Sequence, residues 1–295
     1  MLDGFSYHRI GVGAGSAEIT VAVGGSGPPL LLLHGFPQTH LAWRAVAGRL
    51  ASRYSLVVTD LRGYGDSRGP RPDARHQGYS KRAMAGDMIE VMAALGHERF
   101  LLAGHDRGAR VAHRLALDYP RSVRRLALLD ILPTLAVWEA MDWTAALSTY
   151  HWLFLAQPAP MPERLIGHDP DGYLHHLLDR WAGNKALLEE EAVEAYAAAF
   201  RRPSVIEAAC EDYRAAATID VEHDRADREA GRRIGCPTLL LWGRRYLHTR
   251  SGTPLSVWQA YADDVRDQAF DCGHFLAEED PERTAAALAA FFGHE

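Results

Sequence analysis

Short, uninterrupted apolar runs alternate with amphipathic stretches along most of the chain. Such a run, bounded by turn-forming residues, predicts a strand that is buried on both faces. The runs cover residues 30–33, 56–59, 100–103, 126–129 and 238–242, and helical periodicity follows several of them at residues 81–95, 107–119 and 281–292. Residues 7–12 and 17–23 flank the letters GAGS and predict an initial hairpin. The alternation predicts an α/β fold with a mostly parallel sheet, where ligands bind beyond the carboxyl ends of the strands.

The pattern changes over about a hundred residues after Pro133. This part shows helical periodicity, four tryptophans and little strand signal, until the letters CPTLLLWG restore a buried strand. A separate C-terminal helical domain would not be followed by another strand of this kind. The sequence therefore predicts a core made of residues 1–133 and 234–295, with residues 134–233 inserted as a helical cap.

Composition and charge narrow the classes of partner. The 295 residues are 47% hydrophobic, which is enough for a buried core, and the formal net charge of −6 comes from interspersed acidic and basic residues. No basic face indicates nucleic acid, and no apolar run reaches the roughly 18 residues of a membrane-spanning helix. The first residues carry no secretory signal, and the three cysteines show no CxxC spacing, so neither a disulfide framework nor a metal site is expected. We expect a cytoplasmic protein that acts on a small molecule.

The letters AGHDRGA, at residues 103–109, carry the strongest chemical signal. Gly104 and Gly108 stand two residues on either side of Asp106, which is the glycine spacing of a nucleophile elbow with Asp where an esterase has Ser. The alternative is that Asp106 only caps the following helix, because Asp is a preferred capping residue.

Three further features favour a catalytic interpretation. The letters HGFP follow the strand at 30–33, so the backbone N–H groups of Phe36 and Arg107 are candidates for an oxyanion hole. His274, in DCGHF near the end of the chain, is the candidate general base. Asp130 directly follows the strand at 126–129, whereas the loop RRYLHTRSGTPL after the next strand contains no carboxylate. We therefore predict Asp130 as the acid that orients His274.

A carboxylate nucleophile restricts the substrate. Asp106 is ionised at neutral pH, so it can displace a leaving group from an sp3 carbon and form an alkyl ester. Water activated by His274 would then hydrolyse this ester without any cofactor. The substrate must therefore carry a carbon–halogen bond or an epoxide.

Six segments together carry a family resemblance. The chain resembles the fluoroacetate dehalogenase branch of the α/β-hydrolase superfamily through LLLHGFPQTH, LAGHDRGARV, LLDILPT, YHWLFLAQPAPMPE, CEDYRAA and CGHFLAEEDP. The resemblance implies a small anionic haloacid as substrate and a homodimer as the assembly. It departs from the family at Asp66 in GYGDS and in the loop RRYLHTR.

The same resemblance implies roles for several side chains. Arg107 and Arg110 would bind the substrate carboxylate, for which guanidinium groups are well suited. Arg114, one turn later, is expected to be solvated. The resemblance assigns the departing halide to His151, Trp152 and Tyr213, and assigns Trp181 to the substrate pocket.

Two other functions remain open on the sequence. An epoxide hydrolase would use the same nucleophile with two tyrosine acids, Tyr213 and either Tyr150 or Tyr173. A ligand receptor on an inactive hydrolase fold is the other alternative, although the set of Asp106, Asp130 and His274 argues against it.

Overall fold

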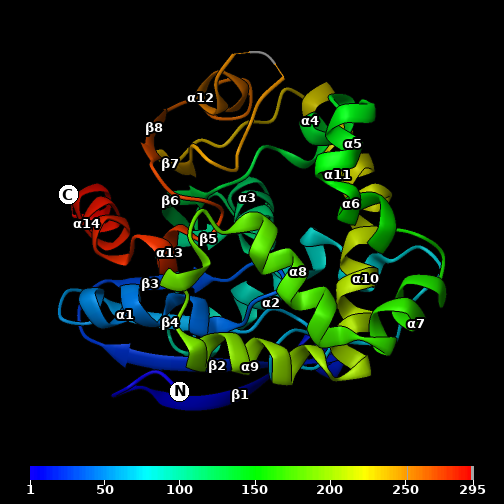
Figure 1. The fold of residues 1–295 in the computed structure, drawn as a ribbon. Coiled ribbons are helices and arrows are strands. Elements are labelled where there is room, and N and C mark those ends of the chain that lie inside the picture. The colour runs from blue at the N-terminus through cyan, green and yellow to red at the C-terminus, as the bar shows by residue number, and fades with distance from the viewer. Residues whose placement is uncertain (251, 294–295) are drawn as a thin grey trace.

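The computed structural model describes residues 1–250 and 252–293 and has one twisted sheet at its centre (Figure 1). Within these residues the sheet has eight strands in the order β1-β2-β4-β3-β5-β6-β7-β8. The strands are β1 (Ser6–Val12), β2 (Ala17–Gly25), β3 (Pro29–Leu33), β4 (Ser55–Thr59), β5 (Phe100–His105), β6 (Val123–Leu129), β7 (Thr238–Gly243) and β8 (Val265–Phe270). Strands β1 and β2 form the expected antiparallel hairpin, and β3 to β8 pair in parallel. The predicted α/β fold with a mostly parallel sheet is confirmed.

The parallel strands are apolar because helices cover both of their faces. Leu30 to Leu33 of β3 pair with β4 on one side and β5 on the other, and all four leucines are fully buried. The helices of the core pack in two groups, α1 (Arg44–Leu50) with α13 (Leu276–Glu279) and α14 (Pro281–Phe292), and α2 (Lys81–Ala94) with α3 (Asp106–Asp118). A further short helix, α12 (Pro254–Trp258), contacts β8. This arrangement leaves the carboxyl ends of the strands for polar loops.

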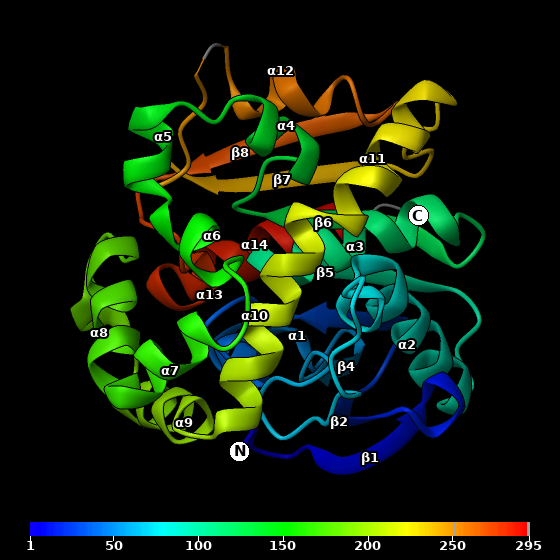
Figure 2. The ribbon, with the colours of Figure 1, turned by 90° about the vertical axis from the view of Figure 1, so that its right-hand side faces the viewer.

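Eight α-helices lie between β6 and β7 in the chain, and we call them the cap. They are α4 (Thr134–Glu139), α5 (Trp143–Ser148), α6 (Tyr150–Leu155), α7 (Met161–His168), α8 (Pro170–Trp181), α9 (Glu190–Phe200), α10 (Pro203–Ala217) and α11 (Ile219–Glu229). Figure 1 shows them gathered on one side of the sheet, and Figure 2 looks onto this side. Helix α10 is central, since it contacts α6, α7, α9 and α11.

Buried ion pairs join the cap to the core. Arg114 of α3 was expected to be solvated, but its side chain is buried and pairs with Asp224 (2.8 Å) and Asp227 of α11. The expectation was wrong because the helical pattern of α3 does not reveal that a second helical layer covers this face. Among the described residues, no helix is both long enough and apolar enough to cross a membrane.

Candidate active site

The turn between β5 and α3 presents Asp106. The backbone of Asp106 has φ +46°, in the left-handed region that is strained for residues other than glycine. A Cβ on Gly104 would lie 2.5 Å from the carbonyl oxygen of Gly108, and one on Gly108 would lie 2.3 Å from that of His34. Only glycine fits at these two positions, because the backbones approach each other directly. The Asp106 side chain makes no helix-capping hydrogen bond, and its Oδ1 instead accepts the Phe36 N–H at 2.9 Å.

The side chains of Asp106, His274 and Asp130 lie in one line, which begins at this turn. His274 Nε2 lies 3.7 Å from Asp106 Oδ2, and His274 Nδ1 lies 2.5 Å from Asp130 Oδ2. The other oxygen of Asp130 accepts the Gly243 N–H at 2.8 Å. An ionised Asp130 fixes the tautomer that carries its proton on Nδ1, so Nε2 presents a lone pair toward Asp106. Nε2 is buried and has no hydrogen-bond partner within the described residues.

Glu279 and the end of α8 hold the loop that carries His274. The Glu279 carboxylate accepts backbone N–H groups from Gly273 (3.0 Å) and Phe275 (3.1 Å) of the loop, and from Gly183 (2.8 Å) of the cap. The His274 N–H donates to the Trp181 carbonyl at 2.8 Å. Glu279 was not predicted from the sequence, although a carboxylate five residues after the candidate base was a visible signal.

Opposing effects set the ionisation of the two carboxylates. Burial by itself would raise the pKa of Asp106, but favourable electrostatic interactions, those with the Arg107 and Arg110 guanidinium groups among them, outweigh it and lower the pKa below the ordinary value. Burial raises the pKa of Asp130, although the hydrogen bond from His274 acts in the opposite direction and lowers it. Asp106 therefore remains ionised at neutral pH, which suits the nucleophilic role expected from the sequence.

Two arginines lie beside Asp106 in the first turns of α3. Arg107 is fully buried, and its Nε and Nη2 donate to the Asp212 carboxylate at 2.9 and 2.5 Å. Arg110 Nη1 donates to the Leu132 carbonyl and to Thr134 Oγ1, both at 3.0 Å. Arg107 Nη1 and Arg110 Nε are buried without a partner in the described part of the chain. Unpartnered buried donors are costly, so their presence indicates a site for an anion.

Aromatic side chains of the cap cover the two guanidinium groups. Arg107 Cζ lies 4.1 Å from the ring centre of Tyr213, and Arg110 Cζ lies 4.5 Å from that of Trp152. The His151 ring lies 5.7 Å from the Tyr213 ring and 4.6 Å from the Trp181 ring. The structure thus brings together the four cap residues named from the resemblance.

The protonation states of His151 and Tyr213 leave each side chain with a hydrogen-bond donor. Burial lowers the pKa of His151 to about 3, so the neutral ring carries one N–H, and its Nδ1 has no partner among the described residues. Burial raises the pKa of Tyr213, which keeps its hydroxyl protonated.

Tyr246 is a further aromatic neighbour that sequence reasoning missed. Its ring centre lies 4.3 Å from that of His274 and 6.0 Å from that of Trp181. Tyr246 belongs to the loop RRYLHTR, whose departure from the family pattern was noted without a role for this residue.

Comparisons with known proteins agree with this geometry. Residues 28–281 match the model of the α/β hydrolase fold family. The chain belongs to the α/β-hydrolase family. A fluoroacetate dehalogenase from Burkholderia sp is 44% identical to this hydrolase over 99% of the chain and 95% of the relative, which confirms the resemblance. A soluble epoxide hydrolase from Corynebacterium sp. (strain C12) is 30% identical over 99% of the chain and 95% of the relative. A solved structure from Nostoc sp PCC 7120, described as an α/β hydrolase, superimposes with a TM-score of 0.96 at 47% identity, covering all of both chains.

The tyrosines proposed for an epoxide hydrolase do not all reach the site of this hydrolase. Tyr213 contacts Phe36, with ring centres 5.4 Å apart. Tyr173 instead stacks on Phe200, with ring centres 6.2 Å apart. Tyr150 contacts His176 and His151, at ring distances of 5.9 and 6.2 Å. The cap rings that contact Tyr213 are those of His151 and Trp152, at 5.7 and 6.0 Å, rather than that of a second tyrosine.

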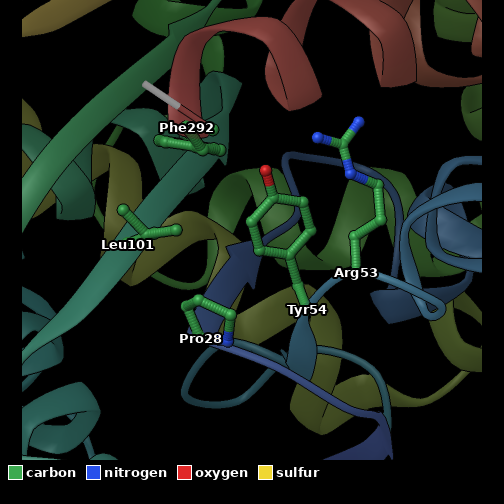
Figure 3. Close-up of a pocket in the computed structure, with 6 residues that line it drawn as sticks. Pro28, Arg53, Tyr54, Leu101 and Phe292 are labelled. Carbon is green, nitrogen blue, oxygen red and sulfur yellow. The ribbon is translucent and has the colours of Figure 1, made fainter. Parts of the chain in front are cut away.

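Other hollows of this hydrolase lie away from Asp106. Figure 3 shows one that is lined by Pro28, Arg53, Tyr54, Leu101, Phe292 and Gly293. Pro28 precedes β3 and Leu101 lies near the start of β5, so this hollow is at the amino ends of the strands. A second hollow lies between α9 and the core pair His40 and Asp60, which bond to each other at 2.9 Å. In the part of the chain that the structure describes, no group of His, Cys, Asp or Glu side chains is arranged to hold a metal ion.

Proposed function

We propose that this hydrolase converts short 2-haloacids, such as fluoroacetate and chloroacetate, to glycolate and halide with water as the only co-substrate. The observation that carries the proposal is the pair of unpartnered donors, Arg107 Nη1 and Arg110 Nε, beside the ionised Asp106. Guanidinium groups bind carboxylates, so a substrate held there has its reactive carbon next to the nucleophile. The 44% identity to a fluoroacetate dehalogenase supports the same reaction.

In the first step, Asp106 displaces the halide. One carboxylate oxygen attacks the sp3 carbon, the carbon–halogen bond breaks with its electron pair going to the halide, and an ester joins Asp106 to the remaining acid. His151, Trp152 and Tyr213 donate hydrogen bonds to the departing halide. Fluoride is a poor leaving group, so donors that are already oriented lower the barrier to this step.

In the second step, water hydrolyses the ester. His274 Nε2 accepts a proton from water, and the oxygen attacks the carbonyl carbon of the Asp106 ester. The N–H of Phe36, already 2.9 Å from Asp106 Oδ1, stabilises the oxyanion together with the N–H of Arg107. Arg107 lies in the first turn of α3, where backbone N–H groups have no acceptor within the helix. Until the intermediate collapses, Asp130 stabilises the His274 imidazolium. The collapse breaks the bond to the alkoxide, which takes the proton from His274 and leaves as glycolate, and Asp106 loses its remaining proton to solvent and becomes a carboxylate again.

Halide release by the purified protein tests this proposal. We expect fluoride from fluoroacetate and chloride from chloroacetate, and no activity in Asp106→Ala. His274→Asn should accumulate a carboxymethyl adduct on Asp106, visible by intact mass and located by peptide mapping. Diol formation from a small neutral epoxide without halide release from either acid would overturn the proposal in favour of an epoxide hydrolase. An Asp106→Ala variant that turns over normally would overturn the mechanism.

The assembly and location are part of the same proposal. From the family resemblance, we propose that two copies form a homodimer and that the protein works in the cytoplasm. Light scattering coupled to size exclusion should give twice the mass of the 295-residue chain, and a monomer mass would contradict the dimer.

A further inference from the structure

Asp212, on cap helix α10, is the centre of a buried network of charges. Its side chain is fully buried and accepts hydrogen bonds from Arg107, from the Tyr64 hydroxyl at 2.7 Å and from the Lys81 ammonium. Lys81 Nζ also lies 3.4 Å from Asp220 Oδ2. Asp212 and Asp220 belong to the cap, whereas Arg107, Lys81 and Tyr64 belong to the core. The network therefore exists only when the two parts are packed together.

We infer that Asp212 is a positioning residue for the substrate carboxylate, because it holds Arg107 away from Asp106 and leaves one side of its guanidinium free. This inference rests on the proposed function, in which Arg107 binds the acid group of the substrate.

The hydrogen bonds of Arg107 show how this positioning works. Arg107 Nε donates to Asp212 Oδ2. Arg107 Nη2 donates two hydrogen bonds, to Asp212 Oδ1 at 2.5 Å and to the Asp212 main-chain oxygen at 2.9 Å. These bonds use every donor on Nε and Nη2, so only the hydrogens on Nη1 remain. Nη1 has no partner in the described residues. One edge of the guanidinium is thus anchored, and the other is available to an anion.

Asp106 shows why Arg107 needs to be anchored. Arg107 follows the nucleophile directly in sequence, and a buried guanidinium fork pairs strongly with a nearby carboxylate. Within the described residues, however, Asp106 accepts from Phe36 and faces His274, and Arg107 donates no hydrogen bond to it. A pair between Arg107 and Asp106 would occupy the oxygen that must attack the substrate. Asp212 prevents this pair by offering Arg107 a better-placed carboxylate.

Lys81 explains how Arg107 keeps its attraction for anions while it is paired. Asp212 alone would cancel the positive charge of Arg107, but the Lys81 ammonium lies against the same carboxylate. Arg107, Asp212, Lys81 and Asp220 form an alternating row of two positive and two negative groups. The charge of Arg110 therefore balances that of Asp106. When Asp106 becomes an ester, one negative charge leaves with the halide, and the acid group of the substrate keeps its own charge beside Arg107.

The test separates positioning from simple loss of stability. Asp212→Asn removes the nearer of the two carboxylates that face the buried Lys81 ammonium and leaves only Asp220 at 3.4 Å, which destabilises the fold. The double variant Asp212→Asn with Lys81→Met removes both charges, so we expect its melting temperature to recover. Its alkylation of Asp106 by chloroacetate, measured by intact mass in a His274→Asn background, should remain about 100-fold slower than in the parent. Asp212→Glu, which keeps the carboxylate, should restore part of this rate.

A matched control and an independent readout complete the experiment. Asp224→Asn breaks another buried pair between cap and core, at 2.8 Å from Arg114, and should leave the alkylation rate unchanged. Acetate binding by calorimetry should weaken at least tenfold in the double variant and not in the control. Recovery of the alkylation rate together with stability in the double variant would overturn the inference, as would a wild-type protein that does not bind acetate. If the wild type binds acetate and the double variant does not, yet neither releases halide from any haloacid, the inference holds and the proposed function fails.

Discussion

Replacing Asp130 with Asn should stop the proposed reaction between its two steps. Two donors face the Asp130 carboxylate, His274 Nδ1–H at 2.5 Å and the Gly243 N–H at 2.8 Å. An Asn side chain offers only one oxygen, so its NH2 group must face one of these donors. If it faces His274, the imidazole must move its proton to Nε2 and can no longer act as the base. If it faces Gly243, two donors oppose each other in a buried site.

The size of the effect differs between the steps. Attack by Asp106 on the substrate needs no proton transfer, so alkylation should slow by less than about tenfold. Hydrolysis needs His274 as a base, and loss of the correct tautomer in a buried Asp–His pair costs a factor of about 10⁴. That factor corresponds to about 5 kcal/mol in the barrier to hydrolysis. The ester should therefore accumulate instead of turning over.

Rapid quenching followed by intact mass measures both steps. We expect Asp130→Asn to gain one carboxymethyl group per chain within seconds of mixing with chloroacetate, while steady halide release falls to the rate at which the ester decays. Asp267→Asn is the control, because it removes a carboxylate that accepts the Trp242 indole N–H at 2.9 Å and lies outside the catalytic line. Full turnover in Asp130→Asn, without any adduct, would refute the assignment of Asp130 as the orienting acid.

Three further changes test other parts of the site. Glu279→Gln replaces a carboxylate that accepts several backbone N–H groups by an amide, so the free energy of unfolding should fall by about 1–3 kcal/mol in a urea titration; unchanged stability would contradict this role. Burial raises the pKa of Glu278 to about 8. Between about pH 4.5 and pH 8 this side chain is ionised only in the unfolded chain, so the wild type should lose stability as the pH rises through this range. Melting curves should show the stability advantage of Glu278→Gln growing by at most about 1.4 kcal/mol per pH unit, and a constant difference would refute the shift. Tyr213→Phe keeps the ring on Arg107 but removes the hydroxyl, so fluoride release should fall by about 10²-fold and chloride release by less. Ion-electrode assays run in parallel measure both rates, and equal losses would argue against a hydrogen bond to the halide.

Local patterns in the sequence were sufficient for the fold and for the line of Asp106, Asp130 and His274. Buried parallel strands are continuous apolar runs, and the elbow depends on two glycines that almost touch other backbone atoms. Asp130 could be chosen because the competing loop contains no carboxylate. In each case the decisive contact is short in sequence or is fixed by where a strand ends.

The charged residues that hold the site could not be found in this way. Arg107 and Asp212 are 105 residues apart, and Arg114 and Asp224 are 110 apart. In a helical pattern a charged residue looks the same whether it faces water or a second layer of helices. Arg114 was therefore expected to be solvated, and no role was predicted for Asp212 within the segment CEDYRAA. The packing of α10 and α11 on α3 shows the partner of each.

These contacts show which parts of the site the core and the cap each contribute. Asp106, His274 and Asp130 come from loops of the sheet, and in chemical terms they suit any substrate with a reactive sp3 carbon, an epoxide included. In the proposed function, selectivity for an acid comes from Arg107 and Arg110. Of these, Arg107 takes its orientation from Asp212 and its aromatic cover from Tyr213, neighbours on cap helix α10. In the proposed reaction, one helix supplies both the anchor of Arg107 and the Tyr213 donor for the halide, so we expect its position to couple recognition of the acid group to departure of the halogen.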